Sequence, residues 1–371
     1  MRVAILSLLL VLGAIVAPSV AQSLPAEKKA VLVFDIRMDK LNASPLGKQM
    51  KFHELLSNAQ KRAEEKSGKK GGADPSKLVR LYGAISAPKS LAELQSMRPD
   101  KKTPFEFFMR AKYQDAESAK VALQDSLAKD NETIQRNSRT FYPATEGGTM
   151  PPGTMLQQVD DTTLEMATES YAFHVDRKVF SDNLQKAWDK SPEEAVRVAM
   201  DIKGAQSLVA GLIEESKKSA PEAAATKYLD LIDNISHMGI SIDLTGANLL
   251  TIQSTAVDSA QGTELKGELD TLLSQAQAKG KQALPMIGQI MPSMKPVAES
   301  IIGSLVAKSE GNDVSIVIPK PEGFEAAVGE HSQIISALLF GGGGPGAGPG
   351  APPTGGPSGA PAGGSDNKGG Q

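Results

Sequence analysis

The 371 residues contain no cysteine, and this absence excludes thiol catalysis, thiolate metal sites, iron–sulfur clusters and disulfide bonds. Aromatic residues are scarce at 4% of the chain, and Trp188 is the only tryptophan, so we expect no stacking platform for bases or sugars. After residue 21, no stretch approaches the roughly 20 apolar residues that span a bilayer. We therefore expect a mature protein without a membrane span, whose stability comes from burial alone.

Motifs of common catalytic mechanisms are missing as well. The sequence has no G-x-S-x-G, no phosphate-binding loop and no G-x-G-x-x-G after a predicted strand. Its four histidines are far apart, and none has a ligand spacing such as HExxH. We expect neither a metal site nor a cofactor, and no motif assigns a catalytic residue.

The first 21 residues have the pattern of a cleavable signal peptide. Arg2 provides a positive start, residues 3–16 form an apolar run, and small residues stand three and one positions before a cut after Ala21. This pattern predicts an exported protein, periplasmic or secreted, that begins at Gln22. Lipid anchoring as a bacterial lipoprotein is excluded, because there is no cysteine to acylate.

Charge restricts the partners that we expect. The whole chain has a net charge of −3, and removal of the signal segment with Arg2 leaves −4. A negative chain is a poor generic partner for nucleic acid or an anionic membrane, so we expect neither. A protein or peptide partner in the cell envelope is the interaction that we expect instead.

Composition divides the chain into four parts. Residues 1–21 are the signal peptide, residues 22–190 a first α+β domain, and residues 191–340 a second α+β domain. Residues 341–371 consist almost wholly of Gly, Pro, Ala, Ser and Thr without a collagen period, which predicts a disordered tail.

The two predicted domains repeat one order of elements: strand, helix, two strands, helix with an Asp cap, strand, helix. This order predicts two similar α+β domains, each a mainly antiparallel sheet with helices on one face. Internal duplication and chance similarity between two generic α+β halves both remain open. The corresponding landmarks are strands at 30–37 and 195–203, helical patterns at 45–66 and 205–217, strand pairs at 78–86 with 105–113 and 239–244 with 249–256, helix caps at Asp115 and Asp258, and further strands at 162–173 and 314–318.

Three functional hypotheses follow from this organisation. The first is a non-enzymatic binding or interaction protein of the envelope, which presents its sheet faces or the groove between its domains. The second is a hydrolase with an unrecognised site in that groove, for which Asp35, Asp201, Ser86 and His174 are the residues to test. The third is a structural envelope protein that is tethered by its tail.

In composition and layout, the chain also resembles a group of proteins. A cysteine-free exported chain with a Val33-Phe34-Asp35-Ile36-Arg37 strand, a duplicated α+β layout and a Gly/Pro tail resembles the uncharacterised exported proteins of planctomycete-type bacteria. The resemblance extends over the whole chain, carries no catalytic motif and implies no activity.

Overall fold

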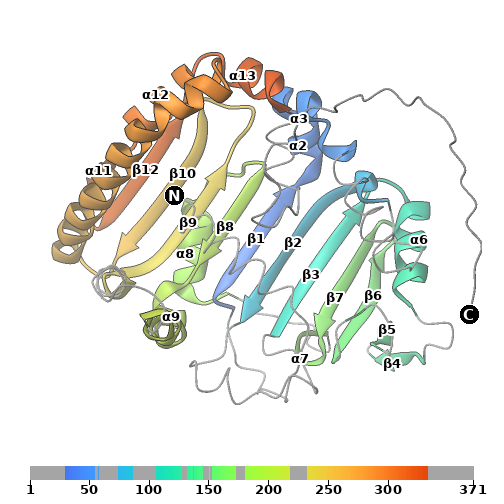
Figure 1. Ribbon diagram of the computed structural model, residues 1–371. Helices are drawn as coiled ribbons and strands as arrows, with labels where there is room; N and C mark the ends of the chain where they lie inside the picture. Colours follow the sequence, from blue (N-terminus) through green and yellow to red (C-terminus); the bar gives the residue numbers. More distant parts are fainter. Residues whose placement is uncertain are drawn as a thin grey trace, which may run out of the picture.

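The structure is a computed structural model, in which the described strands form one large sheet (Figure 1). The predicted signal peptide at 1–21, the predicted tail at 341–371 and the candidate residue His174 lie outside the described residues. The described residues are 30–54, 57, 74–86, 106–127, 132–136, 138–144, 150, 153–172, 180–217 and 232–332.

The sheet has 12 strands in the order β11-β12-β10-β9-β8-β1-β2-β3-β7-β6-β5-β4, and each neighbouring pair is antiparallel. The prediction of an α+β protein with a mainly antiparallel sheet is confirmed. The strands are β1 (Leu32–Arg37), β2 (Leu78–Ser86), β3 (Glu106–Tyr113), β4 (Ile134–Arg136), β5 (Arg139–Pro143), β6 (Thr154–Asp160), β7 (Thr163–Thr168), β8 (Val196–Met200), β9 (Ile235–Ile242), β10 (Asn248–Ala256), β11 (Ala307–Glu310) and β12 (Asp313–Pro319).

The middle of the sheet is the β1–β8 pair, which joins residues before and after the predicted boundary at 190/191. From this seam, one side runs β2-β3-β7-β6 and the other runs β9-β10-β12-β11. The sheet is therefore continuous across the predicted domain boundary, and the strands on its two sides follow matching orders.

Two of the helices begin at the predicted Asp caps. Asp115 Oδ1 accepts a hydrogen bond from Ser118 N, and Asp258 Oδ1 accepts one from Gln261 N, both at 2.8 Å. The described helices are α2 (Met38–Ala43), α3 (Pro45–Met50), the 3₁₀ turn η1 (Pro75–Lys77), α6 (Ala116–Ser126), α7 (Glu169–Ala172), α8 (Asp182–Lys190), α9 (Ile202–Lys217), α11 (Ser259–Ile290), α12 (Met294–Gly303) and α13 (Phe324–Glu330).

The two faces of the sheet differ in chemistry, because successive side chains of a strand point to opposite sides. We use the name charged face for the side that bears Asp35 and Arg37 of β1. The apolar face is the side that bears Leu32, Phe34 and Ile36.

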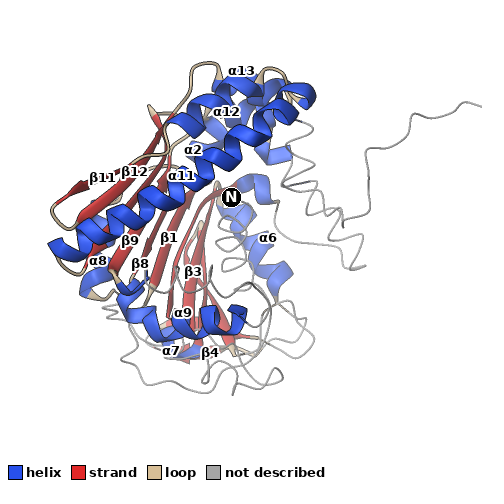
Figure 2. Cartoon of the chain, turned by 60° about the vertical axis from the view of Figure 1, so that its left-hand side comes forward, coloured by secondary structure: helices blue, strands red, loops and turns tan. Residues whose placement is uncertain are grey.

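Helices pack against both faces, so the prediction that they lie on one face is wrong. On the charged face, Leu184 of α8 packs with Val33, and a Cβ at Gly239 would lie 2.1 Å from Ser191 Oγ, so glycine permits the close approach of the chain after α8. On the apolar face, Leu123 of α6 packs with sheet residues near one end and Leu265 of α11 packs near the other. Figure 2 shows α11 crossing in front of the strands. The strands carry apolar residues on both sides, which is why one layer of helices is not enough.

Two predicted elements are not continuous. The predicted helix at 45–66 is interrupted after Met50, because Lys51 adopts a left-handed conformation with φ of 50°. The predicted strand at 162–173 ends at Thr168 and continues as α7, where Tyr171 packs against Phe141.

Candidate functional site

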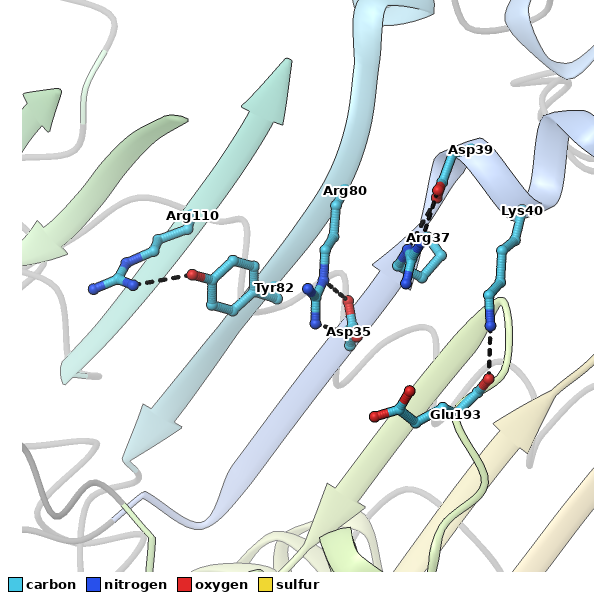
Figure 3. A network of polar contacts seen from close by, with 8 residues as sticks. All are labelled: Asp35, Arg37, Asp39, Lys40, Arg80, Tyr82, Arg110 and Glu193. Carbon is cyan, nitrogen blue, oxygen red and sulfur yellow. Dashed lines mark hydrogen bonds and ion pairs between the residues drawn. The ribbon is translucent and has the colours of Figure 1, made fainter. Parts of the chain in front are cut away.

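A row of polar side chains crosses the charged face (Figure 3). The strand register places Asp35 of β1 beside Tyr82 of β2, Tyr82 beside Arg110 of β3, and Arg110 beside Glu165 of β7. Residues directly opposite one another on neighbouring strands share a face of the sheet. Four residues that are distant in sequence therefore form one continuous row.

Both carboxylates of this row are buried and engaged. Arg80 donates to Asp35 through Nε and Nη2, both at 2.7 Å, which is a bidentate ion pair. Glu165, whose side chain is 0% exposed, accepts from Arg110 Nε at 2.5 Å and from Gln157 Nε2 at 2.7 Å. These bonds offset the cost of burying the two charges.

Tyr82 links the two arginines. The guanidinium of Arg80 lies 4.9 Å from the centroid of the Tyr82 ring, and Arg110 Nη1 donates to Tyr82 Oη at 3.0 Å. The hydrogen bonds to Asp35 raise the pKa of Arg80. Burial acts to lower the pKa of Arg110, but the charge of Glu165 and the hydrogen bonds to Tyr82 and Glu165 together outweigh it, and the pKa is raised. Both arginines are therefore permanently charged.

A second row on the same face consists of cations. Arg37 of β1 lies directly opposite Arg80 of β2, and Arg80 lies directly opposite Lys112 of β3. Arg37 is held by Asp39, to which it donates from Nε at 3.0 Å and from Nη2 at 2.8 Å. Figure 3 shows these guanidiniums beside the longer polar row. Like charges at opposed positions repel, so this row stabilises the sheet less than an alternation of charges would.

The residues proposed for a hydrolase do not converge. Asp35 is paired with Arg80, Ser86 Oγ donates to the carbonyl oxygen of Glu106 at 3.1 Å, and Asp201 Oδ1 accepts from Gly204 N at 2.8 Å as the cap of α9. No hydrogen bond joins any two of these three. His174 lies outside the described residues.

Ser86 and Asp201 lie on opposite sides of β1. Asp201 N donates to the carbonyl oxygen of Val31 at 2.8 Å, and Val31 N donates to that of Ile85, the neighbour of Ser86, at 2.9 Å. The whole width of a strand therefore separates the two side chains. Ser86 and Asp201 are therefore not a nucleophile and base within hydrogen-bond reach of each other, and the hydroxyl that donates to Asp201 is that of Ser181.

The charged face has a different character beyond the seam. Lys190 Nζ lies 2.7 Å from Asp313 Oδ1, and Thr255 Oγ1 donates to the same carboxylate at 2.6 Å. His237 is buried beside them, and its Nε2 has no hydrogen-bond partner within the described part of the chain. Burial, followed by the charge of Lys190, lowers the pKa of His237.

The apolar face is unusual at its centre. The buried residues Leu32, Ile85, Val198 and Ile240, from four neighbouring strands, form a cluster that contains strand residues only, as far as the described residues show. The apolar-face clusters near the two ends of the sheet each include helix residues, from α6 and from α11. Half-buried neighbours extend the central cluster: Phe34, Phe107, Val196, Met200, Met238, Leu250 and Ile252.

Within the described ranges, no group of three or more acidic or histidine side chains is placed to hold a metal ion. No helix of the same residues has the length and apolar character needed to cross a membrane.

Sequence analysis missed the central residues of the polar row, namely Arg80, Tyr82, Arg110 and Glu165. The available signal was the spacing of polar residues two apart on strands, as in Arg80 with Tyr82 and Arg110 with Lys112. Such spacing identifies a face, but the register between strands is needed to show which residues lie side by side.

No protein-family model matches the chain, and no curated protein matches it. Among solved structures, crystal form III of TP0453 is similar at 10% identity, with a TM-score of 0.37, over 86% of this chain and 99% of that chain. Crystal form IV of TP0453 is similar at 12% identity, with a TM-score of 0.37, over 84% of this chain and 94% of that chain. The likeness is weak, and neither fold nor function is inferred from it.

Proposed function

We propose that this chain is an exported binding protein of the cell envelope, and that the centre of its apolar face takes an apolar ligand or the apolar side chains of a partner. The observation that carries the proposal is the central cluster around Leu32 and Val198, to which no described helix contributes a side chain. Among the described residues, a cluster of strand side chains that no helix side chain joins is a candidate interaction surface.

The polar groups support binding over hydrolysis. Asp35, Asp201 and Ser86 are each engaged in contacts that hold the sheet or cap a helix. A carboxylate that is saturated by arginine is poorly suited to accept a proton from a nucleophile. Export and the envelope location rest on the signal-peptide pattern at 1–21.

We also propose that the two halves arose by internal duplication. The matching strand orders on the two sides of the seam support this proposal. So does the spacing after each helix cap, since the fourth and seventh residues are buried in both cases. These residues are Ala119 and Ala122 after Asp115, and Gly262 and Leu265 after Asp258.

Binding of an uncharged apolar fluorophore, N-phenyl-1-naphthylamine, tests the first proposal. Ile36 and Val196 are half-buried and directly opposite each other on the apolar face. The double variant Ile36→Gln/Val196→Gln is expected to bind the probe about tenfold more weakly, because it removes two aliphatic contacts. The measurement is the fluorescence titration of the purified protein.

The matched control is Val159→Gln/Val257→Gln, which alters two exposed valines outside the central cluster. It is expected to bind the probe as the parent protein does. Equal weakening in both double variants, with unchanged unfolding midpoints, would contradict a site at the centre of the apolar face.

A further inference from the structure

The end of α8 lies over a buried histidine on the charged face of the second half. His237 of β9 is 4% exposed, and its direct neighbour on the next strand is Thr255 of β10. Lys190 Nζ lies 3.3 Å from Thr255 Oγ1. A Cβ at Gly239, two positions after His237, would lie 2.1 Å from Ser191 Oγ. The last residue of α8 and its cap therefore cover the strand positions beside this histidine.

The two ring nitrogens of His237 have different surroundings. Nδ1 lies 3.2 Å from Ser236 Oγ, whereas Nε2 is buried and has no hydrogen-bond partner among the residues that the structure describes. Protonation turns both ring nitrogens into donors. A buried donor without an acceptor carries the full cost of its lost hydration, so this position opposes the charged form of the ring.

Charged groups from three parts of the chain act on the ring. Lys186 and Lys190 belong to α8, Asp201 follows β8, and Asp313 begins β12. Burial and then the charge of Lys190 lower the pKa of His237, while the two carboxylates act in the opposite direction. Both carboxylates are already engaged, since Asp201 caps α9 and Asp313 lies 2.7 Å from Lys190 Nζ. Burial and Lys190 are therefore the main obstacles to protonation.

A single movement removes both obstacles. We use the name terminal turn for Trp188–Ser191, the last residues of α8 with their cap. When this turn lifts from the sheet, water reaches His237 and the ammonium of Lys190 moves away from the ring. The side chains of Lys190 and Asp313 are 43% and 45% exposed, and an ion pair so exposed resists the movement only weakly. Leu184, nearer the start of α8, is 0% exposed and anchors the first turns of the helix.

We propose that the terminal turn of α8 closes over the neutral ring of His237 and opens when the ring is protonated, while the first turns of the helix stay docked. Opening separates Lys190 from Asp313 and brings Thr255, which donates to the same carboxylate, into contact with solvent. The proposal goes beyond binding at the apolar face, because it concerns a conformational change on the opposite side of the sheet.

Trp188, the only tryptophan of the chain, lies in the terminal turn and reports on it. Its ring centroid is 3.8 Å from the guanidinium carbon of Arg197 and 6.3 Å from the ring centroid of Phe180. The test is the emission spectrum of the purified protein from about pH 8 to about pH 5, with far-UV circular dichroism at each pH. The emission maximum is expected to move to longer wavelength with a midpoint below about pH 6.5, while the far-UV signal changes little.

Three variants separate this opening from other effects of acid. His237→Gln retains a neutral polar side chain at all pH values and is expected to abolish the shift in emission. Lys190→Gln removes both the repulsive charge and the ion pair with Asp313, so its midpoint is expected to move to higher pH by roughly half a unit or more. The matched control is His331→Gln, at a buried histidine whose Nε2 lies 3.0 Å from Ser293 Oγ, and it is expected to retain the parent transition.

Three results would overturn the proposal. One is a constant emission spectrum of the parent protein over the whole pH range. Another is an emission shift that persists in His237→Gln with the parent midpoint, which would assign the transition to a different group. The third is loss of the far-UV signal at the same midpoint as the emission shift, which would show that the whole fold, and not the terminal turn, responds to acid.

Discussion

The two sides of the β1–β8 seam share a strand order but differ in what they present on the charged face. Before the seam, the row that starts at Asp35 continues through Tyr82 and Arg110. After the seam, the same row runs from Arg197 to the uncharged Ser241 and Thr251. The strand arrangement therefore does not require the charges of the first half, and this difference favours a role for them outside folding.

The apolar face shows the opposite behaviour, since it is apolar on both sides of the seam. On the strands of the first half, Phe34 lies opposite Gly83, which lies opposite Met109. On the strands of the second half, Phe34 lies opposite Val198, which lies opposite Ile240. Burial against α6 and α11 constrains the outer strands of both halves in the same way. The centre between these helices remains apolar although no described helix residue joins its cluster.

The largest expected effect concerns the helices that follow the two Asp caps. Leu265 of α11 is fully buried, and Ala122 occupies the equivalent position in α6. Leu265→Ala is expected to lower the free energy of unfolding by about 3 to 4 kcal/mol, because it leaves a cavity. Ala122→Leu is expected to cost about 1 to 3 kcal/mol through overpacking. Urea unfolding measures both, and a neutral Ala122→Leu would show that α6 has room that α11 lacks.

An ion pair from each half provides the next comparison. Arg110→Met removes the charged partner of the fully buried Glu165, which keeps the hydrogen bond from Gln157, and is expected to cost about 2 to 3 kcal/mol. Lys190→Met removes a pair with Asp313 in which both side chains are more than 40% exposed, and it is expected to cost less than about 1 kcal/mol. Both are read from urea midpoints. Equal losses of stability would contradict the expectation that the buried Arg110–Glu165 pair contributes more than the exposed Lys190–Asp313 pair.

The smallest expected effect is a pH dependence that belongs to the second half. The pKa of His237 is lowered by burial and by Lys190 and Lys186, against the charges of Asp313 and Asp201. The unfolded chain therefore binds a proton more readily, and stability is expected to fall as the pH drops below about 6.5.

In the variant His237→Gln, the urea midpoint is expected to change less between about pH 7 and pH 5 than it does in the parent protein. The control is His53→Gln, at a histidine whose side chain is 53% exposed, and this variant is expected to retain the parent slope. An unchanged slope in His237→Gln would mean that other groups cause the acid sensitivity.

Local signals predicted much of the fold. The strand predicted at 78–86 is β2, and Asp115 and Asp258 cap helices as predicted, because alternation and side-chain capping are encoded within a few residues. The short strands β4 and β11 were missed, since three or four mostly exposed residues carry no apolar alternation. The apolar stripe of a helix shows that the helix packs on the sheet but not on which face, so the presence of helices on both faces could not be predicted.

The candidate sites depend on information that is not local. Arg37, Arg80 and Lys112 lie 43 and 32 positions apart in sequence, and they become neighbours only through the register of β1, β2 and β3. A shift of one residue in that register would send one of these side chains to the other face. The same limit explains why Asp35, Asp201 and Ser86 were considered together although β1 separates two of them.

The four-residue strand β11 protects the far end of the sheet. It pairs with β12, whose Val314, Ile316 and Ile318 make it a segment with the composition of aggregation-prone strands. Gly311, with φ of 62°, turns the chain between them, and such hairpins close within about 10 μs. At this end of the described sheet the edge strand is therefore short and charged, and the apolar β12 is paired on both sides, so a second copy of the chain meets no long apolar edge here.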